Sequence, residues 1–326
     1  MIKEITEQYH PGILEEAGRR FGVVPERVKD LGGFESYVYE YTANGADRIL
    51  KITHQLRRTE NTLMGELDFV NYLADGGVPV ARAVASEAGR YAETLDNGFL
   101  AYAFEKAPGK LAGADDWNDA LFEQWGRCTG RMHALTKAYV PSDPAYRRAS
   151  WREDDMLNVA DGLAGQTLII ENAEALIRRI SSLPETKDGY GLIHNDLHQK
   201  NFFVDNGRMT AFDFDDTAYN YFVNDIAMPL YYALWLPPVA PDDRNAFAKR
   251  FMGNFMNGYA KENTLGSEWF RHIHDFMILR HVILYVIYSN ILDAKDLSPK
   301  EQQLMHRFKH DIENCGPLVE LDLERL

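Results

Sequence analysis

Two acids and an amide stand at a spacing that suits the transfer of a phosphoryl group. The run from His194 to Asn201 reads HNDLHQKN, and a segment AFD ends at Asp213. Phosphoryl transfer depends mainly on positioning and on the stabilisation of charge. An aspartate can orient a hydroxyl and accept its proton, and Mg²⁺ prefers oxygen ligands and keeps several waters. We therefore predict that Asp196 is the base and that Asn201 and Asp213 hold magnesium.

The residues around these side chains predict a loop and a hairpin that position them. The apolar pair Leu192-Ile193 precedes the loop, and residues 202–204 and 209–214 have the composition of strands. Asp205-Asn206-Gly207-Arg208 between them is typical of a tight turn. A hairpin folds back on itself, so it can return Asp213 to the vicinity of Asn201.

A transition-metal cluster is an alternative reading of the same loop. His194, Asp196 and His198 are possible ligands of such a metal. No further metal-ligand motif lies nearby, and Asn201 would then have no task. We favour a structural role for His194, which would brace the loop. His198 stays open, because it could touch a phosphate or be a bystander.

A strand and a helix nearer the N-terminus supply a lysine and a glutamate. Residues 48–53 alternate so that Lys51 faces away from the apolar side chains of the strand, from where a lysine can reach phosphates. On the helix expected from Thr59, Glu66 shares a face with apolar residues. A carboxylate on such a face needs a partner, so we predict a Lys51–Glu66 pair. Glu60, at the helix start, is the alternative.

Further candidate residues lie in turns. Gly33 and Ser36 precede the first strand, where backbone amides could approach phosphates, although a simple β-turn explains them as well. Asp215 is a second acid beside Asp213, either a further metal ligand or a solvated turn residue. Asp225 opens an apolar helix and could be only its N-cap.

Composition limits the function classes. The 326 residues carry a net charge of -14, which argues against nucleic-acid binding through a broad basic surface. The acidic balance favours solubility or attracts a cationic substrate. The N-terminal residues lack an apolar signal region, and the most apolar stretch, which begins at Phe276, is interrupted by Arg280 and His281. We expect a cytoplasmic protein that does not bind membranes.

The order of the predicted elements indicates an α+β protein of two domains. Residues 1–104 read as a β-rich domain, and residues 105–326 as a mainly helical one with a single β island. Cys128 lies on the apolar face of a helix expected over residues 119–138, so we expect it in the core.

The chain resembles the aminoglycoside phosphotransferase and choline kinase group of small-molecule kinases, which are similar in fold to protein kinases. The loop shares the form H-x-D-x-x-x-x-N with the protein-kinase catalytic loop. The resemblance rests on these residues: His194 to Asn201, Ala211 to Asp215, Asn224 to Ala227, Lys51, Glu66 and Gly130 to Leu135.

The resemblance implies a two-lobed fold, in which a small antiparallel sheet with one helix precedes a larger helical lobe. ATP or GTP would bind with Mg²⁺ in the cleft between the lobes. Phe104 and Lys106 would lie at the hinge that holds the base, and Asp225 would brace the catalytic loop. The glycine loop is not of the protein-kinase type, and no A-P-E segment follows, which argues against a conventional protein kinase.

The sequence therefore predicts a phosphotransferase that uses ATP or GTP to phosphorylate a small-molecule hydroxyl, and that is a monomer or homodimer. Two alternatives remain, an atypical bacterial protein Ser/Thr kinase and a nucleotide-binding pseudokinase. The intact set of candidate residues argues against the pseudokinase, and nothing in the sequence identifies the acceptor.

Overall fold

The computed structural model describes residues 3–23, 28–33, 35–236, 243–291 and 297–321. By their contacts the residues form two compact units. Residues 1–110, 138–148 and 202–215 make up the first, and residues 111–137, 149–201 and 216–326 make up the second. We expected one division, after residue 104, whereas by contacts the chain first passes from one unit to the other after Lys110. The segment 202–215, which we expected in the second domain, belongs to the first unit.

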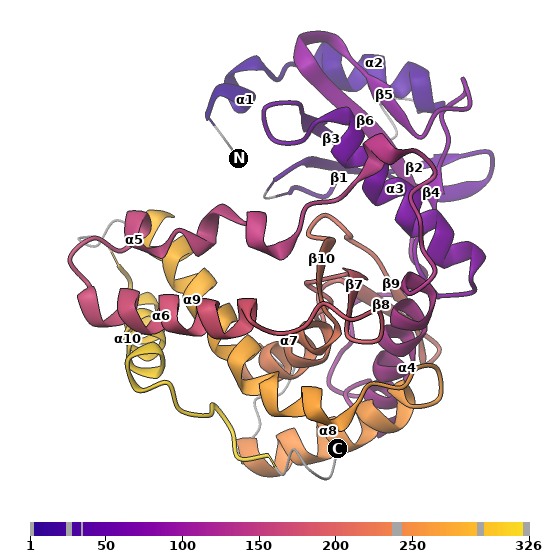
Figure 1. Cartoon of the computed structure of the whole chain (residues 1–326). Coiled ribbons are helices and arrows are strands. Elements are labelled where there is room, and N and C mark those ends of the chain that lie inside the picture. Colours follow the sequence, from indigo (N-terminus) through magenta and orange to yellow (C-terminus); the bar gives the residue numbers. More distant parts are fainter. Residues whose placement is uncertain (1–2, 24–27, 34, 237–242, 292–296, 322–326) are drawn as a thin grey trace. The chain divides into compact units, whose positions relative to one another are not determined.

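The first unit is built on an antiparallel sheet of strand order β1-β2-β3-β6-β4, with β5 also paired to β6 (Figure 1). Its elements are α1 (Lys3–Gln8), α2 (Pro11–Phe21), β1 (Lys29–Asp30), β2 (Tyr37–Ala43), β3 (Ala46–His54), α3 (Glu60–Asp75), β4 (Ala83–Val84), β5 (Ala92–Thr94), a 3₁₀ turn (Asp96–Gly98), β6 (Phe99–Glu105), a second 3₁₀ turn (Pro144–Tyr146), β8 (Phe202–Asp205) and β9 (Arg208–Ala211).

Two asparagine–glycine turns close the hairpins of this unit as the sequence predicts. Asn44 and Gly45, between β2 and β3, have φ of 52° and 77°. Asn206 and Gly207, between β8 and β9, have φ of 48° and 74°. Positive φ at both central residues defines the turn whose twist matches that of paired antiparallel strands.

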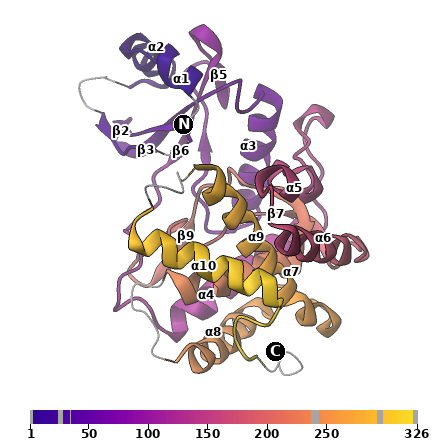
Figure 2. The ribbon, with the colours of Figure 1, turned by 90° about the vertical axis from the view of Figure 1, so that its left-hand side faces the viewer.

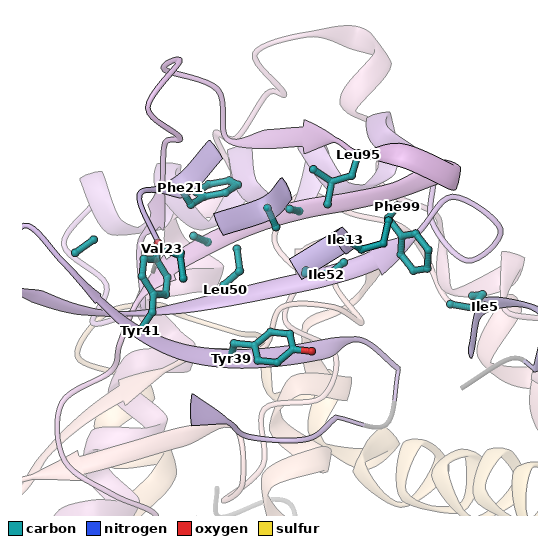
Figure 3. Packing of buried hydrophobic residues seen from close by; sticks show 14 residues of the cluster. Ile5, Ile13, Phe21, Val23, Tyr39, Tyr41, Leu50, Ile52, Leu95 and Phe99 are labelled. Carbon is teal, nitrogen blue, oxygen red and sulfur yellow. The ribbon is translucent and has the colours of Figure 1, made fainter. Parts of the chain in front are cut away.

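One face of the sheet carries the core of the first unit (Figure 3). Ile13 and Phe21 of α2 pack in one cluster with Tyr41 of β2 and with Leu50 and Ile52 of β3, and all of them are buried. Successive side chains of a strand point to opposite faces. Lys51 therefore faces away from this core.

Helix α3 presents an apolar face that includes one acid. The side chain of Thr59 caps the helix by accepting a hydrogen bond from the amide of Thr62 at 3.2 Å. Leu63, Glu66 and Val70 are all fully buried. The expectation that Glu66 lies on the apolar face is confirmed.

The second unit is mainly helical (Figures 1 and 2). Its elements are α4 (Asp119–Thr136), 3₁₀ turns (Trp151–Glu153 and Asp155–Leu157), α5 (Val159–Gly162), α6 (Thr167–Ser181), β7 (Tyr190–Ile193), β10 (Ala218–Tyr221), α7 (Phe222–Trp235), α8 (Arg244–Tyr259), a 3₁₀ turn (Ser267–His272), α9 (Ile273–Ile291) and α10 (Pro299–Asn314).

Close helix packing in this unit depends on glycine. A Cβ on Gly126 of α4 would lie 1.8 Å from the carbonyl oxygen of Phe255, and one on Gly258 of α8 would lie 1.8 Å from that of Glu123. Because neither glycine has a side chain, the backbones of α4 and α8 can touch. Cys128 is buried on α4, as expected.

Strands β7 and β10 pair antiparallel, with Ala218 opposite Ile193 and Tyr221 opposite Tyr190. The loop that holds Asp196 follows β7, and helix α7 follows β10, so this pairing brings the two segments together. Within the described ranges, no helix is long and apolar enough to cross a membrane. The predicted α+β fold, with an antiparallel sheet followed by a helical region, is confirmed.

Candidate active site

A backbone turn at Asn195 sets the direction of the loop that holds Asp196. Asn195 has φ of 71°, a left-handed conformation that asparagine adopts more readily than most residues. Its side-chain oxygen accepts hydrogen bonds from the amides of Asn220 and Asn224, both at 2.9 Å. The loop is therefore fastened to β10 and α7, which belong to the same unit.

Asp225 holds the backbone of the same loop. Its carboxylate accepts hydrogen bonds from the backbone amides of His194 at 3.1 Å and Asn195 at 2.7 Å. It also meets Nε2 of His133 at 3.3 Å, and Nδ1 of His133 lies 2.9 Å from the hydroxyl of Tyr259. Asp225 is fully buried. Asp225 is not the N-cap of α7, a position that Tyr221 occupies; its carboxylate holds the backbone of the loop instead.

The histidines of the loop region have different surroundings. Burial lowers the pKa of His133 despite the opposing effect of Asp225, so the ring is neutral at neutral pH. His194 is buried, and its Nδ1 accepts a hydrogen bond from the amide of Asp196 at 3.4 Å. Nε2 of His198 lies 3.4 Å from Oδ2 of Asp196. His194 thus contacts the loop backbone, and His198 contacts the acid itself.

A cation lies against the other oxygen of Asp196. Nη2 of Arg280, on α9, donates to Oδ1 of Asp196 at 2.7 Å, and Nε of Arg280 donates to the hydroxyl of Tyr232 at 2.7 Å. Burial opposes the charge of Arg280, but Asp196 outweighs it and raises the pKa of the guanidinium. Asp196 is therefore held by charged or polar groups at both oxygens.

Asn201 ends the loop with its amide oriented by the backbone. Its Nδ2 donates to the carbonyl oxygen of Asp196 at 2.9 Å. The other end of the amide, the oxygen, has no hydrogen bond in the described part of the chain. An oriented oxygen of this kind fits a hard cation such as Mg²⁺.

The lysine of β3 meets acids of the first unit. Nζ of Lys51 lies 2.6 Å from Oδ1 of Asp213 and 3.6 Å from Oδ1 of Asp215. It also lies 5.9 Å from the ring centroid of Phe104 on β6. Burial opposes its charge, but Asp215 and Asp213 raise the pKa of Lys51, which stays protonated. Asp213 has φ of 65°, and its side chain is 41% exposed.

The expected Lys51–Glu66 ion pair is not formed. Oε2 of Glu66 accepts from Nη1 of Arg58 at 2.7 Å, and the same nitrogen lies 3.1 Å from Oδ1 of Asp215. Oε1 of Glu66 has no hydrogen-bond partner among the described residues. Arg58 takes the place expected for Lys51, because Lys51 is held by the acids that follow β9. Glu60 instead accepts from the hydroxyl of Thr94 at 3.2 Å.

Asp215 is anchored rather than open. Its backbone oxygen accepts from Nη2 of Arg58 at 2.5 Å and from Nη2 of Arg148 at 2.6 Å. Burial favours its neutral form, but Lys51 and Arg58 outweigh burial and lower the pKa of its carboxyl. By contrast, burial and the charge of Asp215 raise the pKa of Glu66 to about 7. These contacts favour an anchoring role for Asp215 over metal binding.

The remaining nucleotide-site candidates, Gly33, Ser36 and Lys106, lie in the first unit, before β2 and after β6. A Cβ on Gly33 would lie 2.0 Å from the carbonyl oxygen of Ser36, so the turn before β2 admits only glycine there. The hydroxyl of Ser36 is buried and has no partner in the described ranges. Lys106, after β6, pairs with Glu40 of β2 at 2.5 Å.

The described residues contain no group of three or more His, Cys, Asp and Glu side chains arranged to hold a metal. His194, Asp196 and His198 thus do not form the transition-metal cluster of the alternative interpretation. A site of one amide and one carboxylate, as expected for magnesium, does not require such a group.

Three arginines at these acids were not predicted from the sequence. Arg58, Arg148 and Arg280 contact the candidate acids, yet none was singled out. Arg280 had a signal, because a charged residue within the most apolar stretch of the chain needs a partner. Arg58 and Arg148 lie next to helix or turn ends and carry no such signal.

Comparisons with known proteins identify the family of the chain. A model of the phosphotransferase enzyme family matches residues 27–261. The chain belongs to this family. It is 40% identical over 330 residues to the amicoumacin kinase of Bacillus subtilis (strain 168), a match that covers 99% of this chain and 98% of that protein.

Solved structures give the same result. A structure of an amicoumacin kinase in complex with AMP-PNP, Ca²⁺ and Ami has a TM-score of 0.96 and 38% identity, and covers 100% of this chain and 99% of its own. A microcompartment-associated aminopropanol kinase has a TM-score of 0.74 at 21% identity over 93% of this chain and 95% of its own, which shows the shared fold. The protein is a kinase that acts on a small-molecule hydroxyl.

Proposed function

We propose that this kinase transfers the γ-phosphoryl group of ATP to a hydroxyl of amicoumacin. The observation that carries the proposal is the match to amicoumacin kinases over the whole chain, in sequence and in structure. One of those structures holds an ATP analogue together with a divalent cation and Ami. A match that omits no part of the chain includes the segments that form the acceptor site.

Asp196 is the residue we assign to the acceptor hydroxyl. A carboxylate positioned beside the hydroxyl orients it and takes its proton as the bond to phosphorus forms. The support is local: Asp225 and Asn195 fix the backbone of the loop, and Arg280 and His198 hold the carboxylate. A held carboxylate loses little freedom when the acceptor binds.

Lys51, Asn201 and Asp213 are assigned to the nucleotide and its metal. Mg²⁺, when bound, would neutralise charge on the β- and γ-phosphates. Asn201 fits it through its oriented amide oxygen. Asp213 fits it through a carboxylate that is partly exposed, and protonated Lys51 beside Asp213 supplies positive charge for the phosphates. Gly33, Ser36, Phe104 and Lys106 remain proposed contacts of the nucleotide.

The test is a phosphorylation assay with purified protein, amicoumacin, Mg²⁺ and either ATP or GTP. Mass spectrometry of the antibiotic should show the addition of one phosphoryl group with ATP. Asp213→Ala should abolish the Mg²⁺-dependent rise in melting temperature that ATP produces in the wild type. Asp205→Ala, which changes an exposed acid of the adjoining hairpin, is the matched control and should keep that rise.

Other results would redirect the assignment. Amicoumacin that stays unmodified while ATP still stabilises the protein would leave a kinase with a different acceptor. Label transferred from ATP to proteins of a cell extract would favour a protein kinase. Binding of ATP without transfer to any metabolite or protein would favour a pseudokinase.

A further inference from the structure

Arg280 is a charged residue in an apolar helix, and it lies beside the acid that we assign to the acceptor. Helix α9 buries Phe276, Met277 and Val282 around it. The guanidinium donates to Asp196 at 2.7 Å through Nη2, and it donates to Tyr232 through both Nε and Nη2. Its carbon lies 5.3 Å from the centroid of the Tyr232 ring.

One edge of this guanidinium is open. Nε and Nη2 have partners, whereas Nη1 makes no hydrogen bond in the described part of the chain. The side chain is 19% exposed. A guanidinium has five N–H donors in a fixed plane, so the two donors of Nη1 remain for a ligand beside Asp196.

The position of this edge decides what it can bind. An acceptor hydroxyl on Asp196 lies next to Arg280, because Asp196 and Arg280 are in direct contact. Nη1 and Nη2 share one carbon, so an oxygen bound at Nη1 belongs close to that hydroxyl. A substituent on the adjacent carbon of the acceptor satisfies this spacing.

The charges around Arg280 favour a neutral oxygen. Asp196 accepts from Nη2 at 2.7 Å and so already balances the charge of the guanidinium. The direct contact with Asp196 leaves no excess positive charge for an anionic group. A hydroxyl or an amide carbonyl can accept from Nη1 without repulsion from Asp196, whereas a carboxylate there would be repelled by that acid.

We propose that Arg280 is an acceptor-binding residue, and that it selects compounds with a neutral oxygen on the carbon next to the phosphorylated hydroxyl. The inference rests on the proposed function, since it takes Asp196 as the residue that meets the hydroxyl. The acceptor class is then a 1,2-diol or an α-hydroxy amide, and a simple alcohol or an α-hydroxy acid is a poorer acceptor.

The first measurement locates the phosphate on the amicoumacin product by NMR. The neighbouring carbon should carry a hydroxyl or an amide carbonyl, and a product without such an oxygen would overturn the inference. An analogue that lacks only this oxygen should lose about 10- to 100-fold in kcat/KM with the wild type, the range expected for a hydrogen bond to a charged group.

The variant series then assigns the effect to Arg280. Arg280→Gln should lower kcat/KM for amicoumacin by about 10- to 100-fold, mainly through the acceptor KM. For the analogue, which already lacks the oxygen that Arg280 would bind, the same substitution should lower kcat/KM only a little. The KM for ATP should stay within about twofold, and Arg280→Lys should recover part of the loss. The matched control is Arg179→Gln. It removes an exposed guanidinium on α6 that pairs with Asp275 of α9, the helix that carries Arg280.

A fall in kcat with an unchanged acceptor KM, equal for both compounds, would mean that Arg280 only positions Asp196, and the inference would be wrong. A wild type that transfers nothing to amicoumacin would instead contradict the proposed acceptor. The same variants are then compared on the hydroxyl compound that a library screen yields, where an acceptor KM unaffected by Arg280→Gln would overturn the inference.

Discussion

Replacement of Arg58 by methionine should destabilise the first unit strongly. Arg58 bridges Glu66 at 2.7 Å and Asp215 at 3.1 Å, and the three side chains are 9%, 0% and 13% exposed. Removing one partner of a buried ion pair costs about 3–5 kcal/mol, since the other charge is left without compensation. Methionine keeps much of the volume, so lost packing contributes little.

The structure favours the lower end of that range. Asp215 keeps Lys51 at 3.6 Å after the substitution. Glu66, whose pKa is already raised to about 7, can take up a proton and so avoid an unpaired charge. We expect a loss of about 3 kcal/mol from the free energy of unfolding, out of the 5–15 kcal/mol that is typical of a domain.

The distribution of tryptophan allows the two units to be followed separately. All five tryptophans lie in the second unit: Trp117, Trp125, Trp151, Trp235 and Trp269. Urea denaturation followed by tryptophan fluorescence therefore reports on that unit, whereas far-ultraviolet circular dichroism reports on both. Arg58→Met should move the circular dichroism transition to lower urea.

Two further variants test whether the buried ion pair stabilises the first unit. Arg82→Met removes a surface pair with Asp75, whose side chain is 70% exposed, and should cost less than about 1 kcal/mol. Adding Glu66→Gln to Arg58→Met should recover part of the loss, because it removes the uncompensated acid. An Arg58→Met protein as stable as Arg82→Met would show that the buried pair does not stabilise the fold.

The remaining predictions concern the catalytic loop and pH. Asp196→Asn should lower kcat by about 10²- to 10⁴-fold, measured by ADP release, while ATP still raises the melting temperature. Asp225→Asn should reduce both stability and kcat, measured by thermal denaturation and steady-state kinetics, because a buried amide at His194 or Asn195 loses its acceptor. Burial and Asp215 raise the pKa of Glu66 from 4.5 to about 7, so the folded chain binds the extra proton, and the free energy of unfolding should fall as pH rises through that window. Glu66→Gln should flatten this dependence in urea titrations, and a wild-type stability that is constant across the window would contradict it.

Local sequence patterns predicted the secondary-structure elements and indicated the chemistry. The Asn-Gly pairs predicted both hairpin turns, because few residues other than asparagine and glycine adopt positive φ readily. Periodicity placed Lys51 away from the apolar side of its strand and Glu66 on the buried face of α3. The spacing within residues 194–201 indicated phosphoryl transfer, since the residue types that this chemistry requires are few.

Which charged side chains pair with one another depends on the packing of the whole fold. Periodicity tells which face a side chain occupies, but every cation that reaches that face competes for the same acid. Arg58 therefore holds Glu66, and Lys51 turns to Asp213 and Asp215. In the same way Arg280, 84 residues from Asp196 along the chain, reaches its carboxylate because β7 and α9 both pack against α7 in one unit. Contacts over such distances in sequence depend on how helices and strands pack, which no local pattern encodes.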